Sequence, residues 1–481
     1  MAYKHGVYTS EVPTSIIPAV NTTAGLPVVF GTAPVHLLQD RAAVNKPILC
    51  YSYAEAVNQL GYSKNWADYT LCEVMYSQFS LYNRAPVVFV NVLDPAKHKE
   101  SVTDTELQLT NKVAIINEPI LLETLKVKKA SAGEALKIGV DYEAAYDDDE
   151  ILNITALDGG ELNEVTSIFI DYDKLNSSAV EDDDIIGGID VSTGASKGLE
   201  TLNQVFPLYG LVPGIVLAPG WSHNSEIAAV MKSKAENINS HFKAIVLCDA
   251  PTDTVTKYTD VNAWKNSNNF TGENQVLCWP KVRLGDDIYY MSTHLLGVLA
   301  TTDSDNDDIP YESPSNKSMQ VDGICLADGT EVVIGSDEAN YMEGQGIATA
   351  LNFIGGWKFW GNRTCCYPNN TDPKDSFISI KRMFNWHAQT FIQTYWAKVD
   401  KPINKRLIET VVDSENIRIN GFVAEGVLLG GRIEFQESEN PTTNLLDGII
   451  KFHTYFTPST PAREIENVIE YDPAYFSSLF S

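Results

Sequence analysis

Three aspartates near residue 303 have a spacing that could bind a cation. Asp303, Asp305 and Asp307 match the first ligand positions of a calcium-binding loop. That loop needs glycine at its sixth position and glutamate at its twelfth, where this chain has Asp308 and Pro314. The sequence therefore excludes a calcium loop of this type and leaves only loose cation binding by an acidic turn.

The other groups that could do chemistry also lack a complete pattern. The stretch 188–197 contains two glycines and a lysine but lacks the Gly-Lys-Ser/Thr triplet of a phosphate loop. The eight histidines form no His-x-x-x-His or Glu-x-x-His pair, and the seven cysteines form no Cys-x-x-Cys pair. Adjacent Cys365 and Cys366 could be a redox device, but ordinary reduced thiols are the simpler interpretation. The sequence thus predicts no metal site, no cofactor and no catalytic residues.

One stretch carries a charge opposite to that of the whole chain. Residues 374–406 hold seven Lys and Arg against two Asp and Glu, a net +5, whereas the chain has a net charge of −28. Its apolar residues recur every three or four positions from Phe377 to Tyr395, which predicts an amphipathic helix within 374–401. Either this is a core helix with a solvated basic face, or its charges bind an acidic partner. The candidate residues are Lys381, Arg382, Lys398, Lys401, Lys405 and Arg406.

The rest of the composition narrows the function classes. A chain of 481 residues with 44% apolar residues is expected to form two to four globular domains. Its acidic pI near 4.6 argues against nucleic acid or an anionic membrane as a direct partner. No apolar run is long enough to span a membrane, and the first residues do not resemble a signal peptide.

Hydrophobic patterns divide the chain into an α/β core that is interrupted once. Apolar strands at Leu26–Phe30, Pro86–Leu93, Gly214–Ala218 and Ala244–Cys248 alternate with helical segments, which predicts a buried parallel sheet. Between them, residues 95–190 show short alternating strands, including Lys137–Val140. Residues 141–184 carry fifteen Asp and Glu against one Lys, a net −14. We expect an inserted, solvated β-rich surface domain, with cation binding by its acidic runs as the less favoured interpretation.

The two ends are predicted to be extended arms around a C-terminal α+β domain. Strands are expected at Ile417–Val423, Val427–Phe435 and Gly448–Phe456. The N-terminal segment contains Val7, Tyr8 and Val12; the C-terminal segment alternates Ile465, Ile469 and Tyr471 with acidic residues. Such segments must pair with a sheet to satisfy their backbone groups. The expected parts are an arm (1–20), the first core part (21–94), the insertion (95–190), the second core part (191–355), a C-terminal domain (356–460) and a second arm (461–481).

Three regions of the chain carry recognisable motifs. They are the opening motif His5–Pro13, the polar loop Thr301–Asn316 with its Ser-Pro-Ser-Asn sequence, and the strand Trp357–Thr364 before the basic helix. In this order they resemble the contractile tail sheath proteins of phages and phage-tail-like particles. The resemblance covers most of the chain except about 95–190. It implies a subtilisin-like core, a basic helix that touches an inner tube, and arms that add strands to the sheet of neighbouring subunits.

The resemblance also implies a function and a set of partners. The chain would polymerise, in rings of probably six, around an inner tail tube and contract to drive that tube through a cell envelope. It would contact baseplate and tail terminator proteins, assemble in the cytoplasm of the host bacterium, and end in a virion or tail-like particle. The alternative is an α/β hydrolase with an unrecognised site. However, the Gly-Thr-Ser and His-Gly-Thr triplets of subtilisin-like enzymes are absent, and a shared fold does not imply a shared activity.

Overall fold

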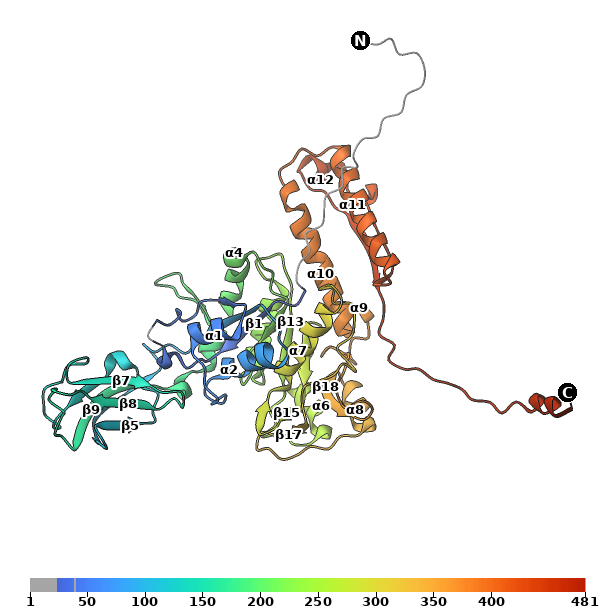
Figure 1. The fold of residues 1–481 in the computed structure, drawn as a ribbon. Helices are drawn as coiled ribbons and strands as arrows, with labels where there is room; N and C mark the ends of the chain where they lie inside the picture. The colour runs from blue at the N-terminus through green and yellow to red at the C-terminus, as the bar shows by residue number, and fades with distance from the viewer. Residues whose placement is uncertain (1–23, 39, 481) are drawn as a thin grey trace, which may run out of the picture.

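The computed structural model describes residues 24–38 and 40–480 and divides them into three parts (Figure 1). A central α/β core holds an eight-stranded sheet. A β-rich part extends from one side, at the left of Figure 1. A C-terminal layer of two long helices and a two-stranded sheet stands on the core, and the last residues run away from it. The mixed, multi-domain α/β fold predicted from the sequence is confirmed.

The core sheet has the strand order β19-β18-β14-β13-β12-β1-β3-β2. Its six inner strands are parallel, and the two edge strands β2 and β19 run antiparallel to their neighbours. Most inner strands are buried along their whole length, which explains their continuous apolar sequences. The bounds are β1 (Pro27–Gly31), β2 (Ile48–Cys50), β3 (Val87–Asn91), β12 (Ile215–Leu217), β13 (Ile245–Asp249), β14 (Gln275–Cys278), β18 (Ile347–Asn352) and β19 (Trp357–Trp360).

Helices cover this sheet, and a small antiparallel sheet lies beside it. The first helix begins where Ser52 accepts a hydrogen bond from the backbone N–H of Glu55. The helical segments are η1 (Val35–Leu37), α1 (Tyr53–Leu60), α2 (Thr70–Met75) with a π-helical continuation η2 (Tyr76–Leu81), η5 (Gly198–Gln204), α4 (Val205–Tyr209), α5 (Ser225–Glu236), α6 (Tyr258–Ser267), α7 (Met291–Ser304) and α8 (Ser336–Glu343). The small sheet contains β15 (Lys281–Leu284), β16 (Asp287–Tyr289) and β17 (Gly323–Cys325).

The β-rich part has a hydrophobic core of its own. Two three-stranded sheets, β4-β9-β6 and β5-β8-β7, enclose Ile154, Ile168, Ile170 and other buried side chains. The strands are β4 (Lys99–Gln108), β5 (Val113–Ile116), β6 (Lys126–Lys128), β7 (Tyr142–Tyr146), β8 (Leu152–Ala156) and β9 (Ser167–Leu175). The strand expected at Lys137–Val140 is wrong: Ile138 and Val140 are exposed in a turn, and the strand begins at Tyr142.

Short segments complete this part and its return to the core. They are η3 (Leu122–Thr124), η4 (Ser177–Ala179), α3 (Asp182–Ile186), β10 (Gly188–Ile189) and β11 (Ser196–Lys197). The acidic run at 181–184 begins α3, where Glu181 and Asp184 form a capping box with the backbone. These carboxylates therefore have a local structural use at the positive end of a short helix.

The C-terminal layer differs from the prediction in two elements. The strand expected at Gly448–Phe456 begins only at His453. Residues Ile417–Val423, expected to be a strand, lie inside the long helix α11 (Lys405–Ala424). Asn404 caps this helix by accepting from the N–H of Leu407, and the helix buries Val411, Ser414, Glu415 and Ile419 at helical spacing. The other elements are α9 (Pro373–Ser376), α10 (Ile378–Tyr395), η6 (Trp396–Lys398), β20 (Leu428–Glu434), η7 (Glu437–Glu439), α12 (Thr442–Leu446), β21 (His453–Pro458) and η8 (Pro473–Phe480).

Candidate functional site

The first two basic residues of α10 are not on the surface. Lys381 and Arg382 are buried where α10 lies against the core, and both form ion pairs within the chain. The sequence interpretation of these two residues as tube-facing is therefore wrong for the isolated chain. A buried charge is tolerated only where it is paired and hydrogen-bonded, and both Lys381 and Arg382 are.

Arg382 joins α10 to the core helix α7. Its guanidinium grips both carboxylate oxygens of Asp303, with an Nη1–Oδ1 distance of 2.8 Å, and the arginine side chain is only 2% exposed. A planar guanidinium matches a carboxylate in this two-pronged geometry. Asp303 is the first residue of the calcium-loop pattern that the sequence excluded. Both of its carboxylate oxygens bind Arg382.

Lys381 belongs to a second group of charges, in which it and Asp375 are buried while Lys374 and Glu273 reach the surface. The Nζ of Lys381 contacts the carboxylates of Glu273 and Asp375, the latter at 3.2 Å, and Lys374 also pairs with Asp375 at 2.6 Å. Burial opposes the charge of Asp375, but the hydrogen bond from Lys374 and the charge of Lys381 outweigh it and lower the pKa of Asp375. The group fixes the start of α10 against the core.

The other four basic residues lie around the turn between α10 and α11. Lys401, Lys405 and Arg406 are exposed and Lys398 is half-buried. Among the described residues only Lys405 of this set has an ion pair, with Glu409 at 3.4 Å. Trp396, Val399 and Ile403 are exposed between these charges. We call residues 396–406 the basic turn; it combines cationic and apolar groups with few partners inside the chain.

The two helices that carry the basic turn are held rigidly together. Arg418 of α11 lies 3.1 Å from Nδ1 of His387 on α10 and 2.6 Å from the buried Glu415. Burial, assisted by the charge of Arg418, lowers the pKa of His387 to about 3, so its ring is neutral near neutral pH. The same ring stacks on Phe456 of β21, with centroids 4.7 Å apart. Sheet and helices therefore form one layer that presents the turn.

The C-terminal arm contacts the described chain only through its first residues, where Ser459 donates to the carbonyl of Gly426 and residues 459–463 line a pocket with Trp360 and Asn362. Residues 459–472 contain no helix or strand, and Figure 1 shows them leaving the molecule toward η8. Ile465, Ile469 and Tyr471 are all exposed, Ile465 to 88%. An extended segment with apolar residues in water is the expected form of an arm that pairs with another chain. The N-terminal candidates Val7, Tyr8 and Val12 lie outside the described residues.

The sheet of the C-terminal layer offers an edge to such a segment. Within the described chain β20 pairs with β21 and with no other strand. The outer edge of β20 is partly occupied, because the Asn416 side chain of α11 accepts from the N–H of Ile433 and donates to its C=O. The outer edge of β21 has no strand partner in the described chain. Unpaired edges of this kind are templates for strand addition.

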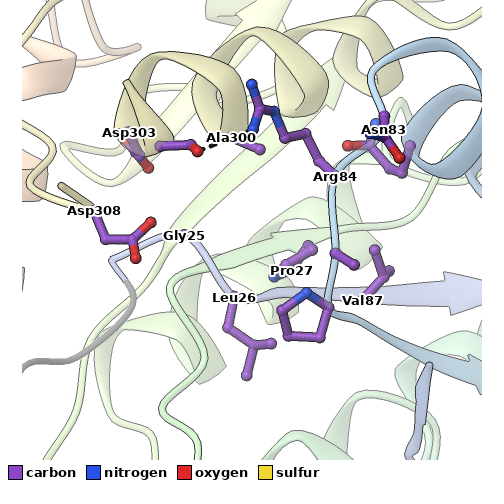
Figure 2. Close-up of a pocket in the computed structure, with 13 residues that line it drawn as sticks. Gly25, Leu26, Pro27, Asn83, Arg84, Val87, Ala300, Asp303 and Asp308 are labelled. Carbon is purple, nitrogen blue, oxygen red and sulfur yellow. Dashed lines mark hydrogen bonds between the residues drawn. The ribbon is translucent and has the colours of Figure 1, made fainter. Parts of the chain in front are cut away.

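A small pocket lies between α7 and the loop before β3 (Figure 2). Asp303 and Asp308 lie near Gly25 on one side, and Arg84 lies opposite, where it donates to Thr301 and Ser304. Burial and the charges of Asp303 and Asp307 raise the pKa of Asp308. No histidine or cysteine is among the described residues that line this pocket.

The remaining chemical candidates are structural. The seven cysteines are all free and buried, and burial raises the pKa of the Cys365 thiol to about 12. Within residues 24–38 and 40–480, no three His, Cys, Asp or Glu side chains gather as a metal site. No helix of this described part is long and apolar enough to span a membrane.

Known proteins similar to this chain have names that agree with one another. No family model matches the sequence. The tail sheath protein of Burkholderia phage BcepMu is 25% identical over 500 residues, covering 99% of this chain and 98% of that protein. The tail sheath protein of Escherichia phage P2 is 23% identical over 359 residues, covering 73% of this chain and 84% of that protein.

Solved structures of low sequence identity share the fold. A chain of the sheath complex of an extracellular contractile injection system, PVC, in its contracted state has a TM-score of 0.58, with 13% identity and 99% of both chains covered. A chain of the contracted helical sheath of the anti-feeding prophage has a TM-score of 0.56, with 11% identity, 98% of this chain and all of that chain covered. The chain is therefore similar over its full length to a phage tail sheath protein and shares its fold with subunits of contractile sheaths.

Proposed function

We propose that this protein is the structural subunit of a contractile tail sheath. Many copies polymerise around an inner tube in an extended state and then contract, which drives the tube through a target cell envelope. The whole-length match to phage tail sheath proteins carries this function. In this proposal the particle is a virion or a phage-tail-like particle assembled in a bacterial cytoplasm, and the core has a subtilisin-like sheet without protease activity.

The arms are proposed to link the subunits. The C-terminal arm, with Ile465, Ile469 and Tyr471, adds a strand to the sheet of β20 and β21 in a neighbouring copy, at the edge of β21 that has no strand partner. The N-terminal segment around Val7, Tyr8 and Val12 adds another. Strand addition forms many backbone hydrogen bonds over a small area, so the linkage can persist while subunits rotate. The edge of β21 that lacks a strand partner among the described residues and the exposed arm support this interpretation.

The basic turn is proposed to hold the inner tube. Lys398, Lys401, Lys405 and Arg406 would face acidic groups on the tube, while Lys381 and Arg382 hold α10 in place behind them. Exposed ion pairs contribute only ~0–1 kcal/mol each, which permits release on contraction while a ring of subunits still sets the register. A chain of this fold occurs in the six-fold symmetrised baseplate of the anti-feeding prophage, which supports six-fold rings and contacts with baseplate and terminator proteins.

The test is to express the full chain with and without its tube protein and to image the products by negative-stain microscopy. Long hollow cylinders are the expected result. A protein that remains a small oligomer under all conditions, including with its tube, would overturn the sheath function. Hydrolysis of an ester or peptide substrate by such an oligomer, abolished by substitution of a pocket residue, would support the enzyme alternative instead.

A further inference from the structure

The last helical segment of the chain exposes apolar side chains that the chain itself does not cover. In η8, Tyr475 is 77% exposed, and Phe476 and Leu479 are also largely exposed. Figure 1 shows η8 at the end of the C-terminal arm, away from the rest of the molecule. Three large apolar side chains on a short segment in water indicate that a partner surface covers them.

A groove between the core and the end of α10 has matching chemistry. It has a volume of about 450 Å³ and is lined by Phe206, Asn239, His241, Phe242, Ile392, Gln393 and Trp396. The rings of Phe206 and Phe242 meet at 4.8 Å, and those of His241 and Trp396 at 5.1 Å, so the walls are aromatic. Trp396 is 58% exposed at the rim. A groove of this size accepts aromatic side chains.

The charges around the two surfaces are complementary. The segment that leads to η8 contains Glu464, Glu466, Glu470 and Asp472 against the single base Arg463, a net −3. The groove opens beside the basic turn, whose Trp396 forms part of both surfaces, and exposed Lys243 follows Phe242. An acidic linker would therefore be attracted to the surface that surrounds the groove.

One end of the two-stranded sheet lies close to the groove. At the end where β20 finishes and β21 begins, Phe452 contacts Phe435 at 5.9 Å and Phe391 of α10 at 6.4 Å. Phe391 directly precedes Ile392, a wall of the groove, and Trp396 lies about one helical turn beyond. An arm strand that ends at this side of the sheet would bring the residues after it to the groove.

We propose that η8 of one subunit docks in this aromatic groove of a neighbouring copy, as an anchor beyond the arm strand. The fourteen residues 459–472 can span about 45 Å at ~3.3 Å per residue, which reaches past the boundary of the chain's own C-terminal layer. The inference rests on the proposed sheath function, because it needs a neighbour at arm's length.

Cysteine cross-linking in assembled cylinders tests the docking. One population carries Ser477→Cys in η8 and the other carries Asn239→Cys in the groove; the seven native cysteines are buried. Co-assembled full-length chains should give a disulfide-linked dimer on a non-reducing gel. In the matched control, Glu226→Cys at the other end of α5 replaces the groove variant and should give at least tenfold less dimer.

A second pair of variants tests the apolar contact. Phe476→Asp with Leu479→Asp should raise the critical concentration for polymerisation at least tenfold, while Ser477→Asp, which adds the same kind of charge to the same segment, should change it by less than twofold. Cylinders without the dimer, equal dimer with Glu226→Cys, or equal critical concentrations would overturn the docking and leave the sheath function intact. If wild-type chains form no cylinders, the sheath function fails, and the docking fails with it.

Discussion

The two ends of α10 carry the same kinds of residue in opposite environments. At the start, Lys381 and Arg382 are buried against acidic partners of the core. Past the end, Lys401 and Arg406 are exposed and have no ion pair among the described residues. Removing a buried charge leaves its partner unsatisfied, whereas removing an exposed charge leaves it in water. The comparison separates residues that hold the helix in place from residues available to another protein, although the sequence presents them as one basic stretch.

The largest effect is expected from breaking the Arg382–Asp303 pair. Arg382→Met keeps much of the side-chain volume but leaves the Asp303 carboxylate, 5% exposed, without its cation. We expect a loss of about 3–5 kcal/mol in the free energy of unfolding, measured by urea denaturation of the monomer. Arg406→Met is the matched control and should change stability by less than about 0.5 kcal/mol. Equal effects of the two variants would contradict the distinction between the ends of α10.

Glu73 is a buried carboxylate that, among the described residues, has no close ion pair like that of Asp303, and it should make the protein less stable as the pH rises. Burial, only partly offset by the charge of Lys281, raises the pKa of Glu73 from 4.5 to about 8, although the group accepts from the N–H of Tyr290 at 2.8 Å. Between these values the folded chain holds a proton that the unfolded chain releases, so stability decreases as pH rises from about 4.5 to 8.

The measurement is the free energy of unfolding at pH 5 and at pH 8. At about 1.4 kcal/mol per pKa unit, the decrease attributable to Glu73 is a few kcal/mol. Glu73→Gln should remove most of this slope and be no less stable than the wild type at pH 8. If the Glu73→Gln variant has the same pH dependence of stability as the wild type, Glu73 ionises at its ordinary pKa. Lys281 then stabilises the Glu73 carboxylate, as Arg382 stabilises that of Asp303.

Loss of Lys381 should cost less than loss of Arg382, because its partners keep other stabilising contacts. Asp375 retains Lys374, and the Glu273 side chain is 39% exposed and can be solvated. We expect Lys381→Met to lower stability by about 1–3 kcal/mol in the same urea assay. The lowered pKa of Asp375 adds stability above its unfolded value of 3.8, which is lost as pH falls through its folded pKa. In Lys381→Met, the stability lost as the pH falls through the folded pKa of Asp375 should be smaller than in the wild type.

Local patterns predicted most elements, but not the partners of the charges. The strands β1, β13 and β20 could be predicted because a few consecutive apolar residues are enough to indicate a strand. Glu273 and Asp303, by contrast, lie 108 and 79 residues from the bases they bind, and no local spacing reveals such a pair. The strand predicted within α11 failed because Ile417, Ile419 and Val423 have strand propensity, which the Asn404 cap and packing on β20 overrode.

The arm shows the other limit of the sequence. Its alternation of apolar and acidic residues predicted a strand-like segment, and in the structure Ile465 and Ile469 are exposed and lie in no helix or strand. Where that segment pairs depends on a second copy, which a single chain does not contain. Thermal unfolding separates the two cases: deletion of 463–481 should leave the melting temperature of the monomer almost unchanged while it abolishes cylinders. A monomer that melts much earlier would show that the arm packs on its own chain.

The smallest effect on the monomer, and the sharpest test of the comparison, comes from reversing charges at the basic turn. Lys401→Glu with Arg406→Glu should leave stability within about 0.5 kcal/mol of the wild type, because both side chains are exposed. Co-sedimentation with the inner tube should nevertheless fall strongly. Each lost surface pair contributes ~0–1 kcal/mol, but a ring of subunits multiplies it, and reversal replaces attraction by repulsion.

Salt and a matched variant distinguish this tube contact from a general charge effect. Lys64→Glu with Lys257→Glu makes the same change of charge at exposed core positions and should bind the tube like the wild type. Binding by the wild type should weaken as salt rises from about 0.05 to 0.5 M, because exposed pairs are screened beyond a Debye length of roughly 4–14 Å over that range. If the turn variant binds as the wild type does at moderate salt, the basic turn faces something other than the tube. The acidic arm of a neighbouring subunit, which carries Glu464, Glu466 and Glu470, is then the partner that its charge fits best.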